Sequence, residues 1–161
     1  MKRDESVLQT YTVDTVQTGE ERSAVFALRM QVFVEEQKVP VEEELDAYDS
    51  TATHFLIRKH PAPENTDSGI VGTARLVDKG EGVGKIGRVA LHLEHRGVGA
   101  GAKLMRYIEQ YARSQGYTEL ILEAQTYAIG FYEKLGYVAE GDVFMDCDIP
   151  HRLMRYQITT N

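Results

Sequence analysis

The sequence predicts one α/β domain of the α+β kind, built on a mixed and mostly antiparallel sheet of about six or seven strands with about four helices. Three patterns support this class. Short segments in which apolar and polar residues alternate indicate strands. The second to fourth of these segments follow one another through turn-like connections, so they are expected to pair antiparallel. The order then changes to strand, helix, strand, helix, which implies a parallel pair of strands.

The first half of the chain is expected to hold four strands and one long helix. Residues 8–16 alternate loosely and suit an opening strand. Thr18 and Glu21 have the spacing of a capping box, and apolar residues recur behind them, which predicts a helix over residues 19–34. The acidic stretch 35–49 shows little periodicity and is expected to be a loop with room for a helical turn. Further strands are expected over residues 54–59, 69–78 and 85–91.

In the second half, a glycine-rich turn over residues 97–101 opens a helix over residues 99–115, which Gly116 ends. The remaining elements are expected to be a strand over 117–124, a short helix over 127–135, and closing strands over 137–147 and 153–158. No internal repeat or second domain is visible, so residues 1–161 are expected to form a single domain.

Charge and cysteine content argue against several classes of protein. The formal net charge is -7 and the sequence pI is about 5.2, which disfavours nucleic acid or an anionic membrane surface as a partner. Cys147 is the only cysteine, so no intrachain disulfide is expected. No apolar run resembles a secretory signal or a bilayer-crossing helix, and the expected compartment is the cytoplasm.

The glycine-rich turn follows an expected strand and opens an expected helix. A helix N-terminus presents backbone N–H groups that lack intrahelical partners, and its dipole favours an anion. Small residues would let a pyrophosphate approach these groups, and Arg96 and Lys103 could add positive charge. The glycines alone are equally compatible with a turn that binds nothing.

Two nucleotide-binding patterns can be rejected, one from its structural context and one from a missing residue. Residues 82–87 fit the G-x-G-x-x-G pattern, but they precede a strand and open no helix. Lys103 is followed by Leu104 rather than by Ser or Thr, so the P-loop pattern is not met. Dinucleotide binding and NTPase chemistry therefore lose their main support.

Two motifs together resemble those of the GCN5-related N-acetyltransferases. Arg96, Gly99 and Gly101 match motif A, which is Arg or Gln, two residues, Gly, one residue, then Gly or Ala. The segment AIGFYEKLGY, residues 128–137, looks like motif B and follows after one helix and one strand. Four further segments look like the YjcF/ElaA-type subgroup: LRMQVFVEEQKVP (28–40), ELDAYD (44–49), His54, and DIPHRLM (148–154).

The resemblance implies that the fourth strand splays from its parallel neighbour and pairs with the pantetheine arm of acetyl-CoA, the acyl donor. The turn is then implied to meet the pyrophosphate. The residues implied in binding acetyl-CoA are Val89, Ala90, Leu91, Arg96, Gly97, Val98, Gly99, Ala100, Gly101, Ala102, Lys103, Gln125, Ala128, Phe131 and Lys134.

The resemblance also implies that Tyr132 is the general acid that protonates the leaving sulfur. The backbone N–H of Leu91 would stabilise the carbonyl oxygen. The alternative for Tyr132 is an aromatic side chain that simply packs on the inner face of its helix. Cys147 has no nearby cation to lower its pKa, so direct attack in a ternary complex is expected rather than an acyl-enzyme.

The general base is left open, because the fourth strand, residues 85–91, contains no Asp or Glu. His151 and Glu36 are candidates, His151 because an imidazole titrates near neutral pH. The other candidates are the carboxylates of the acidic stretch: Glu42, Glu43, Glu44, Asp46 and Asp49. His151 could equally be a turn residue that caps backbone groups. The acidic stretch could equally be a solvated loop, or it could attract a cationic amine.

The expected function is transfer of an acetyl group from acetyl-CoA to a small-molecule or protein amine. The alternative is a non-catalytic module that binds or senses acyl-CoA on the same fold. No metal is expected, because His92, Glu94 and His95 would not point toward one ion. The protein is expected to be a monomer or a homodimer without nucleic-acid or membrane partners.

Overall fold

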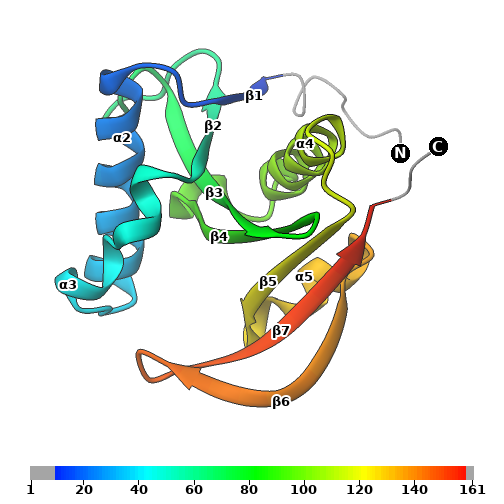
Figure 1. Cartoon of the computed structure of the whole chain (residues 1–161). Coiled ribbons are helices and arrows are strands. Elements are labelled where there is room, and N and C mark those ends of the chain that lie inside the picture. The colour runs from blue at the N-terminus through cyan, green and yellow to red at the C-terminus, as the bar shows by residue number, and fades with distance from the viewer. Residues whose placement is uncertain (1–9, 159–161) are drawn as a thin grey trace, which may run out of the picture. The chain divides into compact units, whose positions relative to one another are not determined.

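The computed structural model describes residues 10–158, which form a seven-stranded sheet and four α-helices. In chain order the elements are β1 (Tyr11–Thr15), α2 (Gly19–Arg29), α3 (Val41–Glu44), β2 (Thr53–Lys59), β3 (Ile70–Gly80), β4 (Val83–Leu91), α4 (Ala100–Ser114), β5 (Glu119–Gln125), α5 (Ile129–Lys134), β6 (Val138–Asp146) and β7 (Ile149–Gln157) (Figure 1). The strand order in the sheet is β1-β2-β3-β4-β5-β7-β6. The predicted fold class is therefore confirmed.

The sheet is mixed, as expected. β4 and β5 pair in parallel from Val83 and Glu119 to Ile86 and Leu122, and β4 continues beyond this stretch to Leu91. β1 pairs antiparallel with β2, and β7 pairs antiparallel with both β5 and β6. The strand–helix–strand order of the second half thus predicted the parallel pairing of β4 with β5.

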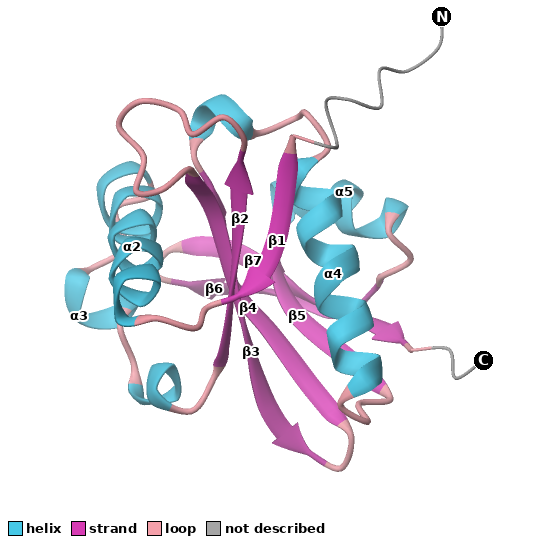
Figure 2. Cartoon of the chain, turned by 90° about the horizontal axis from the view of Figure 1, so that it is seen from above, coloured by secondary structure: helices cyan, strands magenta, loops and turns pink. Residues whose placement is uncertain are grey.

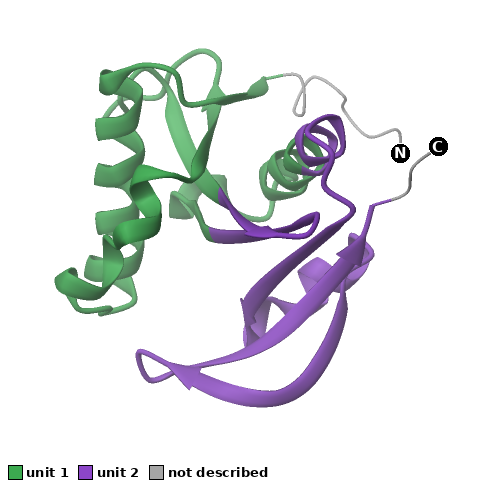
Figure 3. Ribbon diagram, viewed as in Figure 1, with its two compact units in different colours: residues 1–75, 88–108 green, residues 76–87, 109–161 purple. Residues whose placement is uncertain are grey.

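The chain divides into two compact units, which are described separately (Figure 3). Unit 1 comprises residues up to Arg75 together with Arg88–Ile108, and unit 2 comprises Leu76–Gly87 and the residues from Glu109 onward. Unit 1 contains the glycine-rich turn and the acidic stretch, whereas unit 2 contains α5 and the two closing strands.

In unit 1, α2 and the first part of α4 lie on opposite sides of β1 and β2 (Figure 2). Successive strand residues alternate between the two sides, so Leu56 packs with the α2 residues Val25 and Leu28, while Ile57 packs with Ala100 at the start of α4. The predicted capping box begins α2, because the Thr18 hydroxyl accepts a hydrogen bond from the backbone N–H of Glu21 and the Glu21 carboxylate accepts one from Thr18.

A seven-residue π-helix, Met30–Glu36, continues directly from α2. The predicted helix over residues 19–34 is therefore present, but its second half is wound more loosely than an α-helix. Such segments are rare and occur often at functional sites. The π-helix ends at Glu36, one of the candidate bases.

In unit 2, an antiparallel pair of closing strands lies beside β5, and Met154 and Tyr137 are almost fully buried. The Tyr137 ring stacks on Tyr156 at 4.9 Å, and its hydroxyl donates a hydrogen bond to the buried Glu109. β7 begins at Ile149, four residues earlier than the sequence predicts. His151 therefore lies within a strand, and its alternative interpretation as a turn residue is wrong.

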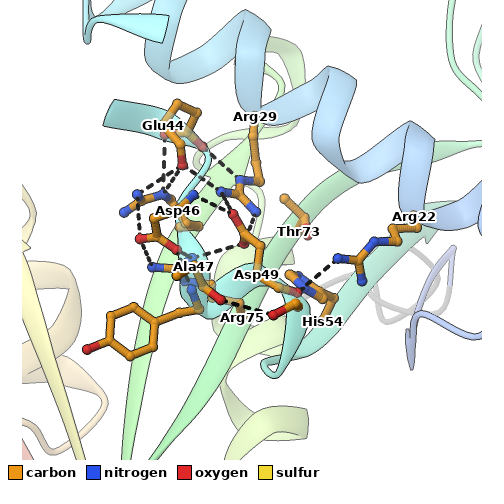
Figure 4. A network of polar contacts seen from close by, with 12 residues as sticks. Arg22, Arg29, Glu44, Asp46, Ala47, Asp49, His54, Thr73 and Arg75 are labelled. Atoms are coloured by element: carbon orange, nitrogen blue, oxygen red, sulfur yellow. Dashed lines mark hydrogen bonds and ion pairs between the residues drawn. The ribbon is translucent and has the colours of Figure 1, made fainter. Parts of the chain in front are cut away.

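The acidic stretch differs most from expectation. It contains α3 and a 3-10 helix, Ala47–Ser50, and the interpretation of its carboxylates as a solvated run is wrong for the two that are almost fully buried, Glu44 and Asp49. Three arginines from α2, β3 and β4 pair with three carboxylates of this stretch. We call the group formed by Arg29, Arg75, Arg88, Glu44, Asp46 and Asp49 the arginine–carboxylate cluster. Figure 4 labels five of its members, Arg29, Arg75, Glu44, Asp46 and Asp49.

Arg29 is the centre of the arginine–carboxylate cluster, with only 1% of its surface exposed. Its Nε lies 2.7 Å from a Glu44 oxygen, and its Nη1 lies 2.8 Å from Asp49 Oδ1. Arg75 bonds the same Asp49 oxygen at 2.9 Å and reaches Asp46 at 2.7 Å. Burial alone would raise the pKa of Asp49, but the hydrogen bonds and charge of the arginines hold that pKa well below its usual range. Burial raises the pKa of Glu44.

Removing Arg29 should destabilise the protein strongly. Arg29→Met keeps much of the side-chain volume but leaves Glu44 and Asp49 buried with fewer partners, so the free energy of unfolding should fall by about 3–5 kcal/mol. Arg58→Met is the matched control, because Arg58 also pairs with a carboxylate, Glu21, but lies 24% exposed. The control should cost less than about 1 kcal/mol. Urea denaturation of both variants measures the difference, and equal costs would contradict the central role of Arg29.

Candidate active site

The glycine-rich turn in unit 1 has the geometry of an anion cradle. Gly97 and Gly99 have φ angles of 78° and 88°, in the left-handed region that favours glycine. α4 begins at Ala100, and its first α-helical hydrogen bond runs from the N–H of Lys103 to the carbonyl of Gly99. The preceding N–H groups therefore belong to a helix N-terminus, where an anion is favoured.

The two basic side chains expected at this turn, those of Arg96 and Lys103, have specific partners. Arg96 donates from Nε to the carbonyl of Leu91 and from Nη2 to the carboxylate of Glu36, each at 2.9 Å. Lys103 donates from Nζ to the carbonyl of Tyr11 in β1 at 2.5 Å. The structure thus brings Glu36 to the turn, in an ion pair with Arg96.

The end of β4 is closely packed. Ala90 is buried in the cluster that α2 forms, and Leu91 packs on the other side near Ala100. Gly72 allows this approach, because a Cβ there would lie 2.3 Å from Leu91 Cδ2 and 3.0 Å from the Ala90 carbonyl oxygen. The N–H of His92 donates to the carbonyl of Val71 at 2.9 Å, which ends the strand.

In unit 2, Tyr132 lies on α5 and is 7% exposed. Its ring contacts Phe131 and Tyr137 edge-on, at 5.0 and 5.9 Å between centroids. Within residues 10–158 its hydroxyl makes no hydrogen bond, so the O–H remains available to a ligand. Burial raises the pKa of Tyr132 far above its usual value, which keeps the phenol protonated. The residue therefore packs as an aromatic and also retains a proton to donate.

His151 lies on β7, opposite Gln125 of β5 and Phe144 of β6. Its Nδ1 lies 2.7 Å from the carbonyl oxygen of Ile149. A carbonyl can only accept, so Nδ1 carries the hydrogen and the neutral ring keeps its lone pair on Nε2. The Phe144 ring stacks on the imidazole at 5.8 Å. This arrangement presents Nε2 as a proton acceptor.

A carboxylate that sequence reasoning did not single out lies on the same face as His151. Glu123 of β5 is directly opposite Leu153, two residues from His151 along β7. Its carboxylate lies 2.5 Å from Nζ of Lys85 on β4. Glu123 is remote in sequence from the fourth strand, and only the parallel register of β4 and β5 could have revealed the pair.

The other predicted residues fall into two groups. Gln125 ends β5, Ala128 lies in the 3-10 helix before α5, and Phe131 and Lys134 lie on α5 with exposed side chains. Glu42 and Glu43 are exposed. The other three acidic candidates, Glu44, Asp46 and Asp49, belong to the arginine–carboxylate cluster. Those three carboxylates therefore already have cationic partners.

Neither a metal site nor a membrane span is found in the part of the chain that the structure describes. No group of three or more His, Cys, Asp or Glu side chains there could hold a metal ion. His95, one of the residues considered for a metal, is buried and bonds the hydroxyl of Tyr11 through Nδ1 at 3.0 Å. None of the helices within residues 10–158 is long and apolar enough to cross a bilayer.

Comparison with known proteins identifies the family. The model of the acetyltransferase (GNAT) family matches residues 22–137. A Bacillus subtilis protein named as an uncharacterized N-acetyltransferase, YjcF, is 37% identical over 136 residues, which covers 84% of this chain and 91% of that protein.

Solved structures agree with this match. An acyl-CoA N-acyltransferase from Pseudomonas aeruginosa is 33% identical with a TM-score of 0.75, covering 90% of this chain and 97% of that one. Escherichia coli ElaA is 25% identical with a TM-score of 0.77, covering 91% and 98%. Because the family model spans more than half of the chain and these relatives match along most of their length, the chain belongs to the GNAT family of acetyltransferases and is similar to YjcF and ElaA.

Proposed function

We propose that this protein transfers an acetyl group from acetyl-CoA to an amine acceptor, by direct attack in a ternary complex. The observation that carries the proposal is the turn from Arg96 to Lys103, where two left-handed glycines lead into the N-terminus of a fifteen-residue helix. This is where the family resemblance assigns the pyrophosphate, and helix N-termini favour such anions.

Two side chains in unit 2 have the properties that the chemistry requires. The amine nitrogen attacks the thioester carbon, and the Leu91 N–H is the proposed donor to the carbonyl oxygen as the C–N bond forms. The C–S bond then breaks while the Tyr132 O–H protonates the leaving sulfur, and His151 Nε2 accepts the proton that the amine loses. His151 returns its proton through solvent and Tyr132 recovers one, so the net products are an amide and free CoA.

Glu36 and Glu123 are weaker candidates for the base than His151. Glu36 is in an ion pair with Arg96, and Glu123 is in one with Lys85. Both carboxylates are thus already engaged with a cation, whereas the hydrogen bond at Nδ1 leaves the Nε2 lone pair of a neutral His151 ring facing outward from that bond. His151 is therefore the proposed base, acting directly or through water.

A CoA titration tests the proposed donor site. Gly97→Ala should weaken CoA binding about tenfold, because a residue with a Cβ disfavours the left-handed conformation and disturbs N–H groups that would face the phosphates. Gly116→Ala is the matched control: Gly116 has a φ of 90°, and an added Cβ at either glycine would meet no atom within 4 Å. Calorimetry measures both Kd values. Binding that is lost equally in both variants, or absent from the unaltered protein, would contradict the site.

Tyr132→Phe should lower kcat for acyl transfer by about 100-fold or more, because it removes the proton donor and keeps the ring packing. Release of CoA thiol in the presence of an amine panel measures the rate. Tyr127→Phe is the control, since Tyr127 is a neighbouring tyrosine that is 80% exposed. An unchanged kcat in Tyr132→Phe would leave Tyr132 with a packing role only.

His151→Gln should lower kcat at neutral pH by about 10- to 100-fold and leave the Kd for CoA unchanged, because the base acts on the acceptor rather than on the donor. The deficit should shrink at high pH, where more of the amine is already deprotonated. His60→Gln is the control, because His60 is exposed and its side chain bonds the hydroxyl of Thr12. A variant whose kcat follows the same pH profile as the unaltered protein would exclude His151 as the base.

A non-catalytic acyl-CoA-binding module is the second candidate. It is favoured by one observation, which is that β4 carries no carboxylate. The same thiol-release assay separates the two functions. Tight CoA binding with no acceleration by any amine would support the binding module.

A further inference from the structure

Arg88 has an unusual backbone conformation for its position. It lies inside β4 with a φ of 53°, and it is the only non-glycine residue within a described strand that has a positive φ. A left-handed backbone conformation costs free energy in a residue other than glycine. It therefore persists only where surrounding contacts hold it. Val89–Leu91, the segment proposed to meet the donor, follows immediately.

The contacts that hold Arg88 come from the end of α3. Its Nη2 donates to the carbonyls of Glu43 and Glu44 at 3.2 and 3.0 Å, and its Nε donates to that of Glu44 at 3.2 Å. Its guanidinium also lies 3.2 Å from the Glu44 carboxylate and 3.4 Å from that of Asp46. The last carbonyls of a helix lack intrahelical donors, so a forked cation is a well-matched partner.

The segment after Arg88 is fixed at its other end as well. The Leu91 carbonyl accepts from Arg96 at 2.9 Å, and the next N–H, that of His92, donates to Val71. Val89–Leu91 is therefore a short length of backbone between two anchors.

We propose that Arg88 is a positioning residue that holds the Val89–Leu91 backbone in the geometry required for acyl transfer, through its bonds to the end of α3. The inference rests on the proposed function for its kinetic consequence. Arg88 itself is not assigned any contact with substrate. Misplacement of reacting groups by about 1 Å can lower rates about 100-fold, so loss of this anchor should lower the rate more than it lowers the affinity for CoA.

Two substitutions and a control test the proposal. Arg88→Gly accepts the left-handed φ but removes every bond to α3. Arg88→Lys keeps the charge but cannot form the fork to two carbonyls. Arg58→Gly is the control, because Arg58 is also a strand arginine with a carboxylate partner and a main-chain partner, Glu21 and Ser68, but lies in β2.

The first readout is hydrogen–deuterium exchange of residues 89–92, which needs no substrate. Exchange should accelerate about tenfold or more in Arg88→Gly, to a smaller extent in Arg88→Lys, and not in the control. The second readout is kinetic. kcat should fall about 10- to 100-fold in Arg88→Gly, while the Kd for CoA changes less than about threefold.

Unchanged exchange in Arg88→Gly would overturn the inference whether or not the protein transfers acyl groups. Faster exchange with an unchanged kcat would overturn the positioning role. By contrast, an unaltered protein that binds no CoA would overturn the proposed function and not the anchoring of the segment. If circular dichroism shows that Arg88→Gly is unfolded, Arg88→Lys decides by the same two readouts.

Discussion

The arginine–carboxylate cluster is the constraint on which the rest of unit 1 depends. Three arginines from α2, β3 and β4 converge on carboxylates of a stretch that has too few apolar residues to pack by itself. Such a group is stable only when every charge has its partners, because an uncompensated buried charge is costly. The acidic stretch is therefore held against the helix and strands, and through Arg88 its position is transmitted to the strand end where the donor is proposed to bind.

Much of this fold could be predicted, because the patterns involved are local. The capping box at Thr18 and the glycine at 116 mark helix ends through contacts within a few residues, and both were recognised correctly. The change from hairpin-like connections to strand–helix–strand predicted the parallel pair of β4 and β5. The roles assigned to Tyr132 and to the glycine-rich turn came from motifs and remain proposals.

The features that could not be predicted depend on contacts between distant segments. Glu44 and Asp49 look like members of a solvated acidic run until their arginine partners, up to 44 residues away, are located. Glu123 becomes a candidate only when the pairing of β4 with β5 brings its carboxylate within reach of Lys85 Nζ. His151 lies between the two predicted closing strands, 137–147 and 153–158, yet β7 pairs with β6 from Ile149 onward. No local pattern encodes such pairings, and an alternation of side chains says nothing about the partner strand.

The hydrogen bond from His151 to the Ile149 carbonyl has a consequence for the energy of proton transfer. Nδ1 donates to the same oxygen whether the imidazole is neutral or cationic, so gaining a proton at Nε2 breaks no existing bond. The stacked Phe144 ring further restrains the imidazole plane. The side chain can therefore change its charge with little nuclear rearrangement, and its reorganisation energy should be small. If His151 acts as the proposed base, much of the solvent reorganisation that accompanies proton transfer in water would already be complete when the chain folds.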